Sequence, residues 1–341
     1  MKRWVAAAII IVLLCLEGCT PYKIPQKKAY RNEIVHTEVN YDYEQLKEDL
    51  FKLKEGHPEK LQVDTIGVSV EGREIYAARI GNGVKKLVVI GGVHAREWMT
   101  SYLLMSLIEV YLNHDKEGKK LKGYPIYQLL EEVSVSFIPM MNPDGIDLVL
   151  NGVGSRDPEL LGTMNEGEAD FSRWKANIAG VDLNRQFPAD WEETESKEAP
   201  SFENYKGTFP LDQPESKAVA NYTLEEKPEM AVAYHLSGSV IFWYYNQKDQ
   251  AYKRDLKIGK KIGRITRYKL VEKEDSEGIA AGYKDWFVKA FEKPGYTIEI
   301  GDQRYDQIGA DEVYRFIEEN QEVVPYLMRE IRNKSISFSK I

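Results

Sequence analysis

The feature that most constrains the fold is a short apolar run followed at once by glycine and an amphipathic segment. Residues 86–90 (KLVVI) are closed by Gly91 and Gly92, and residues 98–112 then carry apolar side chains at helical spacing. A short run without polar alternation is typical of a strand buried on both faces of a parallel sheet. This unit predicts an α/β fold, in which ligand sites gather at the carboxyl ends of the strands.

The same alternation of strands and helices continues along the chain. The expected elements are a hairpin at 68–80, strands at 133–137, 230–234 and 296–300, a turn at 142–145, and helices from Tyr43 and at 215–225, 253–266, 283–291 and 311–333. Pro325 is expected to bend or divide the last helix. We therefore predict a mainly parallel mixed β-sheet flanked by helices on both faces.

The first residues differ in kind from the rest. Lys2 and Arg3 precede the unbroken apolar run Val5–Leu16. This run is shorter than the roughly 20 residues of a membrane-spanning helix, and it fits a secretory signal. It ends in residues 16–19 (LEGC), which resemble the lipobox of bacterial lipoproteins, where the cysteine is acylated.

This resemblance implies a signal peptide at 1–18, lipidation of Cys19 and a lipid-anchored tether at 19–40. The protein is then expected outside the cytoplasm, held on the bacterial membrane. Ordinary signal cleavage and an uncleaved anchor are the alternatives, because Glu17 stands where a small or apolar residue is usual.

Charge and cysteine content exclude two classes of site. The net charge of −8 argues against a nucleic-acid binder, because phosphate contacts require a basic face. The only two cysteines are Cys15 and Cys19, within and at the end of the predicted signal. The mature domain therefore has neither a disulfide nor a thiolate zinc site, and a metal must be held by histidines and carboxylates.

Two histidines and one glutamate stand where such a site is expected. His94 and Glu97 follow the strand at 86–90, and their three-residue spacing places both side chains on one face of a helical turn. His235 closes the strand at 230–234. Together they make a candidate His₂Glu site with an open fourth position. The alternatives are a solvated helix face for the first pair and a core histidine for His235.

Five motifs follow one another along the chain, from the segment with the first two ligands to the last predicted strand. They are 91–98 (GGVHAREW), 142–145 (NPDG), 180–187 (GVDLNRQF), 234–235 (YH) and 296–299 (YTIE). The set resembles the zinc carboxypeptidase family from Tyr41 to Arg332. The resemblance implies the metallocarboxypeptidase fold, a catalytic domain at 41–335, and one Zn²⁺ ion held by His94, Glu97 and His235.

The resemblance also implies roles for other residues. Zinc lowers the pKa of its bound water and polarises the scissile carbonyl. Glu299 resembles the general base that takes the proton of the water and returns it to the leaving amine; the alternative is a strand-end carboxylate in a salt bridge. Asn184 and Arg185 resemble the pair that holds a substrate carboxylate, which a guanidinium can bind through two hydrogen bonds. Arg96 is expected to face the substrate.

Two positions depart from the family pattern, and a third bears on specificity. Alignment on Trp174 places Lys175 where many members have the arginine that stabilises the oxyanion, and a lysine supplies charge without a forked donor. The tyrosine that covers the substrate falls near Glu277, so no covering tyrosine is assigned. Lys284 stands where the family places the residue at the base of the specificity pocket, and a lysine there would favour an acidic group on the substrate; the alternative is a surface lysine.

Within the family, two stretches most resemble the bacterial γ-D-glutamyl-diaminopimelate peptidases. They are 173–177 (RWKAN) and 180–188 (GVDLNRQFP), with 205–207 (YKG) and 213–215 (QPE) adding to the likeness. We therefore expect a zinc metallopeptidase that cuts the γ-D-glutamyl-meso-diaminopimelate bond in cell-wall muropeptides.

Two alternatives remain open. One is a general metallocarboxypeptidase that removes ordinary C-terminal residues. The other is an inactive wall-peptide-binding lipoprotein, against which the presence of all three ligands and Glu299 argues.

Overall fold

The structure is a computed structural model of the chain, and it describes residues 32–35, 40–276, 280–301 and 310–337. The elements below all belong to the unit formed by residues 32–341. The predicted signal peptide, Cys19 and Glu277 lie outside the described residues. Among the described helices, none is both long and apolar enough to span a bilayer.

The described strands form one central mixed sheet of seven strands and a separate small ribbon. The sheet contains β1 (Leu61–Val68), β2 (Glu74–Ile90), β5 (Val133–Ile138), β6 (Met230–Leu236), β7 (Val240–Phe242), β8 (Lys269–Leu270) and β9 (Gly295–Ile300), and the ribbon β3 (Lys120–Leu121) and β4 (Tyr124–Pro125). The second half of β2 is parallel to β5, as are the pairs β2–β6, β6–β9 and β7–β8, whereas β1–β2 and β7–β9 are antiparallel. The predicted mainly parallel mixed sheet is confirmed.

Strand β2 joins two of the predicted elements, the second arm of the hairpin and the buried strand. Val135 of β5 pairs with Ile80 in the first half of β2 and with Leu87 in the second, so β5 lies between the two halves. The chain changes direction around Gly83, where a Cβ atom would lie 2.0 Å from the backbone of Glu132. Only glycine fits so close to another backbone.

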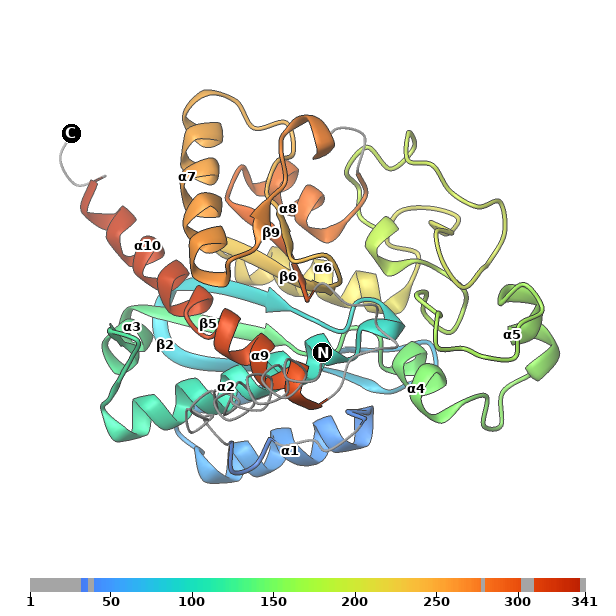
Figure 1. The fold of residues 1–341 in the computed structure, drawn as a ribbon, viewed down its shortest axis with the longest axis horizontal. Helices are drawn as coiled ribbons and strands as arrows, with labels where there is room; N and C mark the ends of the chain where they lie inside the picture. Colours follow the sequence, from blue (N-terminus) through green and yellow to red (C-terminus); the bar gives the residue numbers. More distant parts are fainter. Residues whose placement is uncertain (1–31, 36–39, 277–279, 302–309, 338–341) are drawn as a thin grey trace, which may run out of the picture. The chain divides into compact units, whose positions relative to one another are not determined.

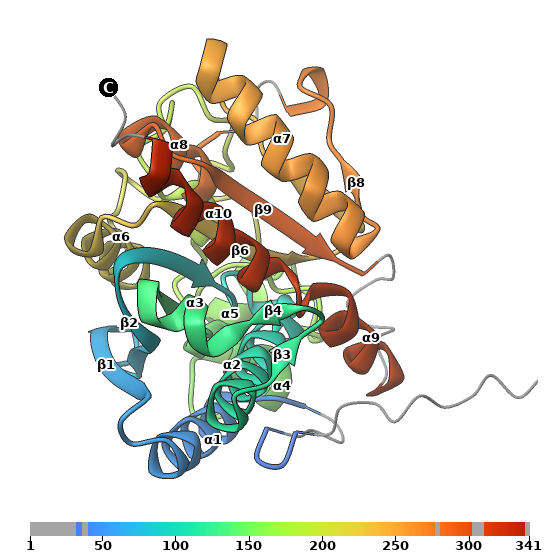
Figure 2. The same cartoon turned by 90° about the vertical axis from the view of Figure 1, so that its left-hand side faces the viewer.

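Helices cover both faces of the sheet (Figures 1 and 2). They are α1 (Tyr43–Gly56), α2 (Met99–Glu117), α3 (Ile126–Glu132), α4 (Pro143–Asn151), α5 (Pro158–Met164), α6 (Pro214–Glu226), α7 (Asp249–Thr266), α8 (Tyr283–Phe291), α9 (Ala310–Asn320) and α10 (Val323–Ser337). Leu87 and Val89 of β2 pack in the core beneath α1, α2 and α10, whereas Val88 and Ile90 pack with α6 and α8. The unbroken apolar run therefore has its predicted cause, burial on both faces.

One predicted boundary is different in the structure, and one expected division of a helix is confirmed. Residues 142–145 do not form a simple turn but begin α4, because Asn142 accepts a hydrogen bond from the backbone N–H of Gly145 over 3.1 Å and Pro143 takes the first helical position. These are the favoured residues for those two positions. The helix predicted at 311–333 is divided into α9 and α10, with Pro325 in the first turn of α10.

Residues 32–35, inside the predicted tether, pack against α2. The backbone N–H groups of Glu33, Ile34 and Val35 donate to the carboxylate of Glu109 over 2.6, 3.1 and 2.7 Å. Glu109 is 1% exposed, and a buried carboxylate is costly without such donors. Packed structure therefore begins before Tyr41, the predicted start of the catalytic domain.

Candidate active site

Three predicted ligands converge beyond the carboxyl ends of β2 and β6. His94 precedes the short turn η1 (Ala95–Glu97), Glu97 is its last residue, and His235 belongs to β6. Nδ1 of His94 lies 2.7 Å from one oxygen of Glu97 and 3.1 Å from Nδ1 of His235. Nδ1 of His235 lies 3.0 Å from the other oxygen of Glu97. All three side chains are buried, which excludes the solvated helix face.

The loop after β2 holds this arrangement through backbone contacts. Gly92 has a φ of +59°, and a Cβ atom there would lie 2.5 Å from the hydroxyl of Ser101. Its N–H donates to the hydroxyl of Thr100 over 2.7 Å, and that hydroxyl donates to the carbonyl of Glu97 over 2.8 Å. The N–H of Leu236 donates to the Glu97 carboxylate over 3.2 Å, which ties η1 to the end of β6.

Asp182 completes the support of the site, although it was not among the predicted site residues. Its carboxylate is fully buried and lies 3.3 Å from Nε2 of His94 and 3.0 Å from the ammonium of Lys175. A carboxylate at the far nitrogen orients an imidazole so that the near nitrogen faces a metal. Its place two residues before Asn184, in the quoted motif, was the available sequence signal.

The donor set fits a zinc ion. Two imidazole nitrogens and a carboxylate face one point, and their candidate ligand atoms all lie within 4.8 Å of one another. The Nδ1 atoms of His94 and His235 face each other at 3.1 Å, so at least one of them presents a lone pair. A bound cation would accept that lone pair. His94, Glu97 and His235 would therefore hold the ion and leave a fourth position open for water and substrate.

Burial and neighbouring groups set the charges of the ligands. Burial favours the neutral form of Glu97, but the imidazoles of His94 and His235 outweigh it and hold the pKa of Glu97 well below its usual value. Burial lowers the pKa of His94, which favours the neutral ring that binds metals. Burial opposes the charged form of His235 as well, yet the hydrogen bond to Glu97 raises the pKa of His235.

Glu299 lies beside the ligands on β9. It is the register partner of His235 in the β6–β9 ladder. Burial raises the pKa of Glu299 to about 7, with the positive charge on His235 opposing the rise. Among the described residues no cation lies at ion-pair distance from Glu299, so the salt-bridge alternative has no support. A carboxylate that titrates near neutrality can both accept and return a proton.

The predicted carboxylate-binding pair lies on the turn η2 (Leu183–Arg185). Asp182 caps this turn by accepting the N–H of Asn184 over 3.0 Å. The side-chain oxygen of Asn184 accepts the N–H of Tyr283 over 3.1 Å, which joins η2 to the start of α8. The Arg185 guanidinium donates to the carbonyl of Asn184 over 3.0 Å, and no described carboxylate forms an ion pair with it. Its remaining donors are available to a substrate carboxylate.

Comparison with known proteins matches residues 46–329 to the model of the zinc carboxypeptidase family. The chain belongs to this family. It is 35% identical over 272 residues to gamma-D-glutamyl-L-diamino acid endopeptidase 1 of Lysinibacillus sphaericus, covering 79% of this chain and 67% of that protein. It is 34% identical over 286 residues to an uncharacterized Bacillus subtilis protein, covering 81% and 74%.

A solved structure agrees with the family fold. Thrombin-activatable fibrinolysis inhibitor superposes with a TM-score of 0.73 at 19% identity, over 87% of this chain and 78% of that one. Family membership and the similar peptidases make this chain a metallopeptidase, as the sequence predicted.

The two cations of the predicted catalytic set lie near Glu299 in this zinc carboxypeptidase. The positive charges of Lys175 and Arg96 both oppose the rise in its pKa. Lys175 is paired with Asp182, and Arg96 donates to the carbonyl of Arg173 over 2.9 Å and lies 3.3 Å from Glu203. Their contacts with substrate stay predictions.

Lys284 is buried and not a surface lysine. Its side chain is 5% exposed and forms an ion pair with Asp285, and its ammonium donates to the carbonyl of Tyr244 over 2.9 Å. Contact with an acidic substrate group stays a prediction, and it would require this ammonium to exchange partners. Tyr283 is part of the core, where its hydroxyl lies 3.0 Å from that of Thr223.

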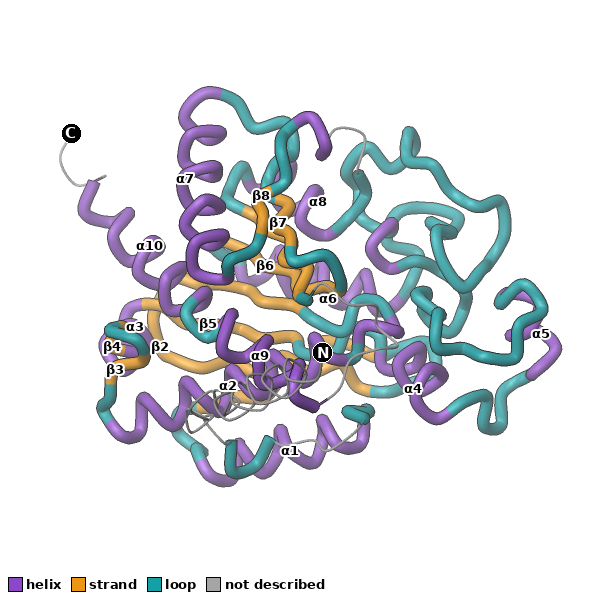
Figure 3. Tube along the Cα trace, viewed as in Figure 1, coloured by secondary structure: helices purple, strands orange, loops and turns teal. Residues whose placement is uncertain are grey.

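A cavity of about 680 Å³ opens beside Arg185. Most of its lining belongs to the long loops between α5 and α6, which Figure 3 draws in teal. Its lining residues are Arg185, Glu193, Thr194, Glu195, Ser196, Lys197, Asn204 and Ala280. The carboxylates of Glu193 and Glu195 are exposed, and no described cation forms an ion pair with either. This cavity therefore presents a free guanidinium and free carboxylates to the same ligand.

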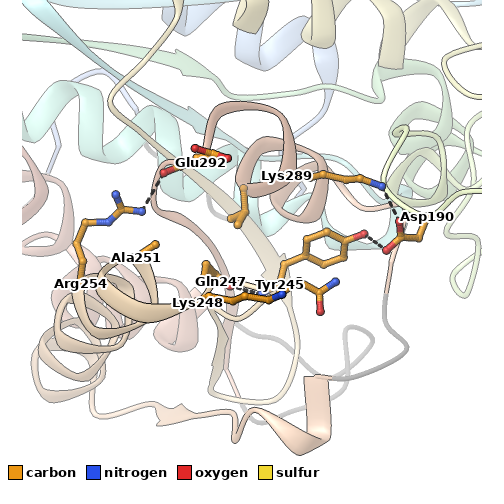
Figure 4. Close-up of a pocket in the computed structure, with 10 residues that line it drawn as sticks. Asp190, Tyr245, Gln247, Lys248, Ala251, Arg254, Lys289 and Glu292 are labelled. Carbon is orange, nitrogen blue, oxygen red and sulfur yellow. Dashed lines mark hydrogen bonds and ion pairs between the residues drawn. The ribbon is translucent and has the colours of Figure 1, made fainter.

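A second cavity of about 550 Å³ adjoins α7 and α8 (Figure 4). Figure 4 shows Lys289 and the hydroxyl of Tyr245 both directed at Asp190, each over 2.5 Å. Arg254 donates to the carbonyl of Glu292 over 3.1 Å. Because these groups pair with one another, the second cavity offers a ligand less free charge than the cavity beside Arg185.

Proposed function

We propose that this enzyme hydrolyses peptide bonds in peptidoglycan stem peptides, at the γ-D-glutamyl-meso-diaminopimelate bond. The observation that carries the proposal is the similarity to the endopeptidase of Lysinibacillus sphaericus, whose name states a γ-D-glutamyl bond to a diamino acid. The match extends over 79% of this chain and 67% of that relative.

The cavity beside Arg185 supports the same substrate. The side chain of diaminopimelate ends in a carboxylate and an amino group, whereas no ordinary C-terminal residue carries both groups on its side chain. Arg185 can bind a carboxylate through two hydrogen bonds, and Glu193 or Glu195 can accept from an ammonium group.

In the proposed reaction each site residue has a separate role. The single zinc ion that we propose would, when bound, polarise the scissile carbonyl and acidify water. Glu299 accepts the proton of the attacking water and delivers it to the nitrogen of the departing diamino acid. Lys175 supplies positive charge near the developing oxyanion, and Asn184 and Arg185 hold the substrate carboxylate in register.

We also propose that the enzyme works outside the cytoplasm, attached to the membrane through Cys19. The apolar run and the LEGC sequence support this placement, since they combine a signal with an acylatable cysteine. Cell-wall muropeptides are accessible there.

Digestion of L-Ala-γ-D-Glu-meso-diaminopimelate, followed by mass spectrometry, tests the substrate. The full chain is compared with a chelator-treated sample and with the Glu299→Gln variant. Release of diaminopimelate by the untreated enzyme alone is expected. If the enzyme instead removes ordinary C-terminal residues from linear peptides and releases no diaminopimelate, it is a general carboxypeptidase. Binding of the tripeptide with zinc present and no cleavage would point to the wall-binding lipoprotein.

A further inference from the structure

Helix α7 carries a row of basic side chains along one face. Lys253, Lys257, Lys260 and Arg264 are all exposed, and Arg267 at the C-cap is exposed beyond them. At about 100° per residue, spacings of four, three and four residues hold the first four within about 30° of one line along the helix. We call these five residues the basic row. With a rise of about 1.5 Å per residue, its helical part is about 16 Å long.

The basic row has no internal counter-charge. Among the described residues, no carboxylate forms an ion pair with any of the five side chains. The two acidic residues of α7 lie elsewhere, because Asp249 is in the first turn and Asp255 is buried and paired with Arg254. Like charges at this spacing disfavour a helix, and they stand together on a protein whose net charge is −8. An external anionic partner would reduce the repulsion between these like charges.

The opposite face of α7 holds the helix in place. Ile258, Gly259 and Ile262 are buried against the sheet, and α7 packs against β7, β8, α9 and α10 (Figure 2). A Cβ atom on Gly263 would lie 2.9 Å from the carbonyl of Tyr268, so the helix and the chain that leads into β8 are in close contact. The basic row is therefore displayed by a rigid element and not by a loop.

We propose that the basic row docks this protein on an anionic phospholipid bilayer. A straight row on a rigid helix meets a plane of phosphates along its whole length, so its side chains can all approach headgroups together. Near an anionic leaflet each such lysine or arginine strengthens binding about fivefold. Besides a lipid anchor, a basic surface is a usual second contribution to membrane attachment. Docking through α7 would supply that contribution in this protein, and it does not depend on the peptide substrate.

Vesicle sedimentation with the full chain tests the docking surface. Binding is measured on phosphatidylglycerol–phosphatidylcholine vesicles and on phosphatidylcholine vesicles, so that attachment through the N-terminal segment is common to both. The variant Lys253→Gln/Lys257→Gln/Lys260→Gln/Arg264→Gln removes four charges of the basic row. A matched control, Lys52→Gln/Lys116→Gln/Lys120→Gln/Lys217→Gln, removes four exposed lysines from other faces.

Wild type and control are expected to bind the anionic vesicles more strongly than the neutral ones. In the variant of the basic row the ratio of the two affinities should be smaller by at least about tenfold. Raising salt from about 0.1 M to about 0.5 M should abolish the preference of the wild type, because screening shortens the range of the charges. Unchanged zinc content and thermal midpoint would show that the variant is folded. Equal preference in wild type and variant would overturn the proposal, as would binding of wild type to a soluble polyphosphate chain without binding to vesicles.

Discussion

In the proposed mechanism Glu299 changes its protonation state twice in each catalytic cycle, and its surroundings decide whether it can. A carboxylate in water is almost fully ionised at neutral pH and returns a proton poorly. Burial beside Glu97 raises the pKa of Glu299 to about 7, while His235, Lys175 and Arg96 limit the rise. The side chain is thereby suited to both halves of a hydrolysis.

Glu299→Gln should separate catalysis from metal binding. The amide cannot accept the proton of the water, so kcat on the diaminopimelate tripeptide is expected to fall by about 10²–10⁴. Zinc content, measured by plasma mass spectrometry, should stay that of the wild type because Glu299 is not a ligand. The control Glu292→Gln changes an exposed carboxylate at the end of α8 and should leave kcat unaltered. Substantial activity in Glu299→Gln would remove Glu299 from its assigned role.

Glu215 should make stability depend on pH. Its carboxylate is fully buried at the start of α6 and accepts the N–H of Val70 over 3.1 Å and the amide of Asn177 over 3.2 Å. Burial raises the pKa of Glu215 to about 7 from its usual 4.5. Between these values the folded state holds a proton that the unfolded state releases, so the stabilisation is complete below the lower value and is lost as pH rises.

The size of this effect follows from the pKa difference. Each unit corresponds to about 1.4 kcal/mol, so the wild type should lose about 3 kcal/mol of unfolding free energy between about pH 5 and about pH 8, relative to Glu215→Gln. Urea unfolding of both proteins at the two pH values measures the difference. Parallel pH dependences would mean that Glu215 is already ionised in the folded state at the lower pH.

At the scale of elements, a network of charges joins the β1–β2 turn to α4. Asp144 is fully buried and accepts from the hydroxyl of Ser69, the N–H of Glu71 and the guanidinium of Arg73, over 2.9, 2.8 and 2.7 Å. Arg73 also bonds Asp147 on the same helix over 3.0 Å. The hairpin is thus held against the helix that follows the 142–145 motif.

Arg73→Met should loosen this junction. It leaves Asp144 buried without its cation, and removal of one partner from a buried pair is strongly destabilising. Because the Arg73 side chain is 26% exposed, we expect a loss of about 2 kcal/mol in denaturant unfolding. The control Lys52→Met breaks the exposed pair with Glu48 and should cost less than about 0.5 kcal/mol. Equal losses in both variants would show that burial of Asp144 contributes nothing.

For the whole molecule, the proposed metal ligands come from parts that are distant in the chain. His94 and Glu97 follow β2, whereas His235 lies on β6. An ion that binds only the folded state stabilises it by about 4 kcal/mol when present at about a thousand times its Kd. Chelation should therefore lower the thermal midpoint of the wild type and of Glu299→Gln, measured by scanning fluorimetry. His235→Ala should lose most of this response, and an unchanged response in His235→Ala would place the stabilising ion elsewhere.

Sequence patterns predicted those features that depend on neighbours in the chain. Apolar runs and helical spacing identified the strands β5, β6 and β9 and the helix α8, because burial of a strand or a helix face imposes a period on the residues themselves. The same local patterns gave a wrong prediction at Asn142, because the residue types that favour a turn also favour the start of a helix. Residues 32–35 were placed in a tether because their own sequence gives no sign of their hydrogen bonds to the buried Glu109.

By itself, the sequence determined the α/β class and the family, and it predicted His94, Glu97, His235 and Glu299 as site residues, because ligand chemistry restricts the residue types and the motifs preserve their order. Tertiary structure alone decided what surrounds them. Asp182 reaches His94 across 88 positions of sequence, and the pKa of Glu299 depends on how deeply β9 is covered. Such properties arise from distances and solvent exclusion between segments remote in the chain, which no local pattern encodes.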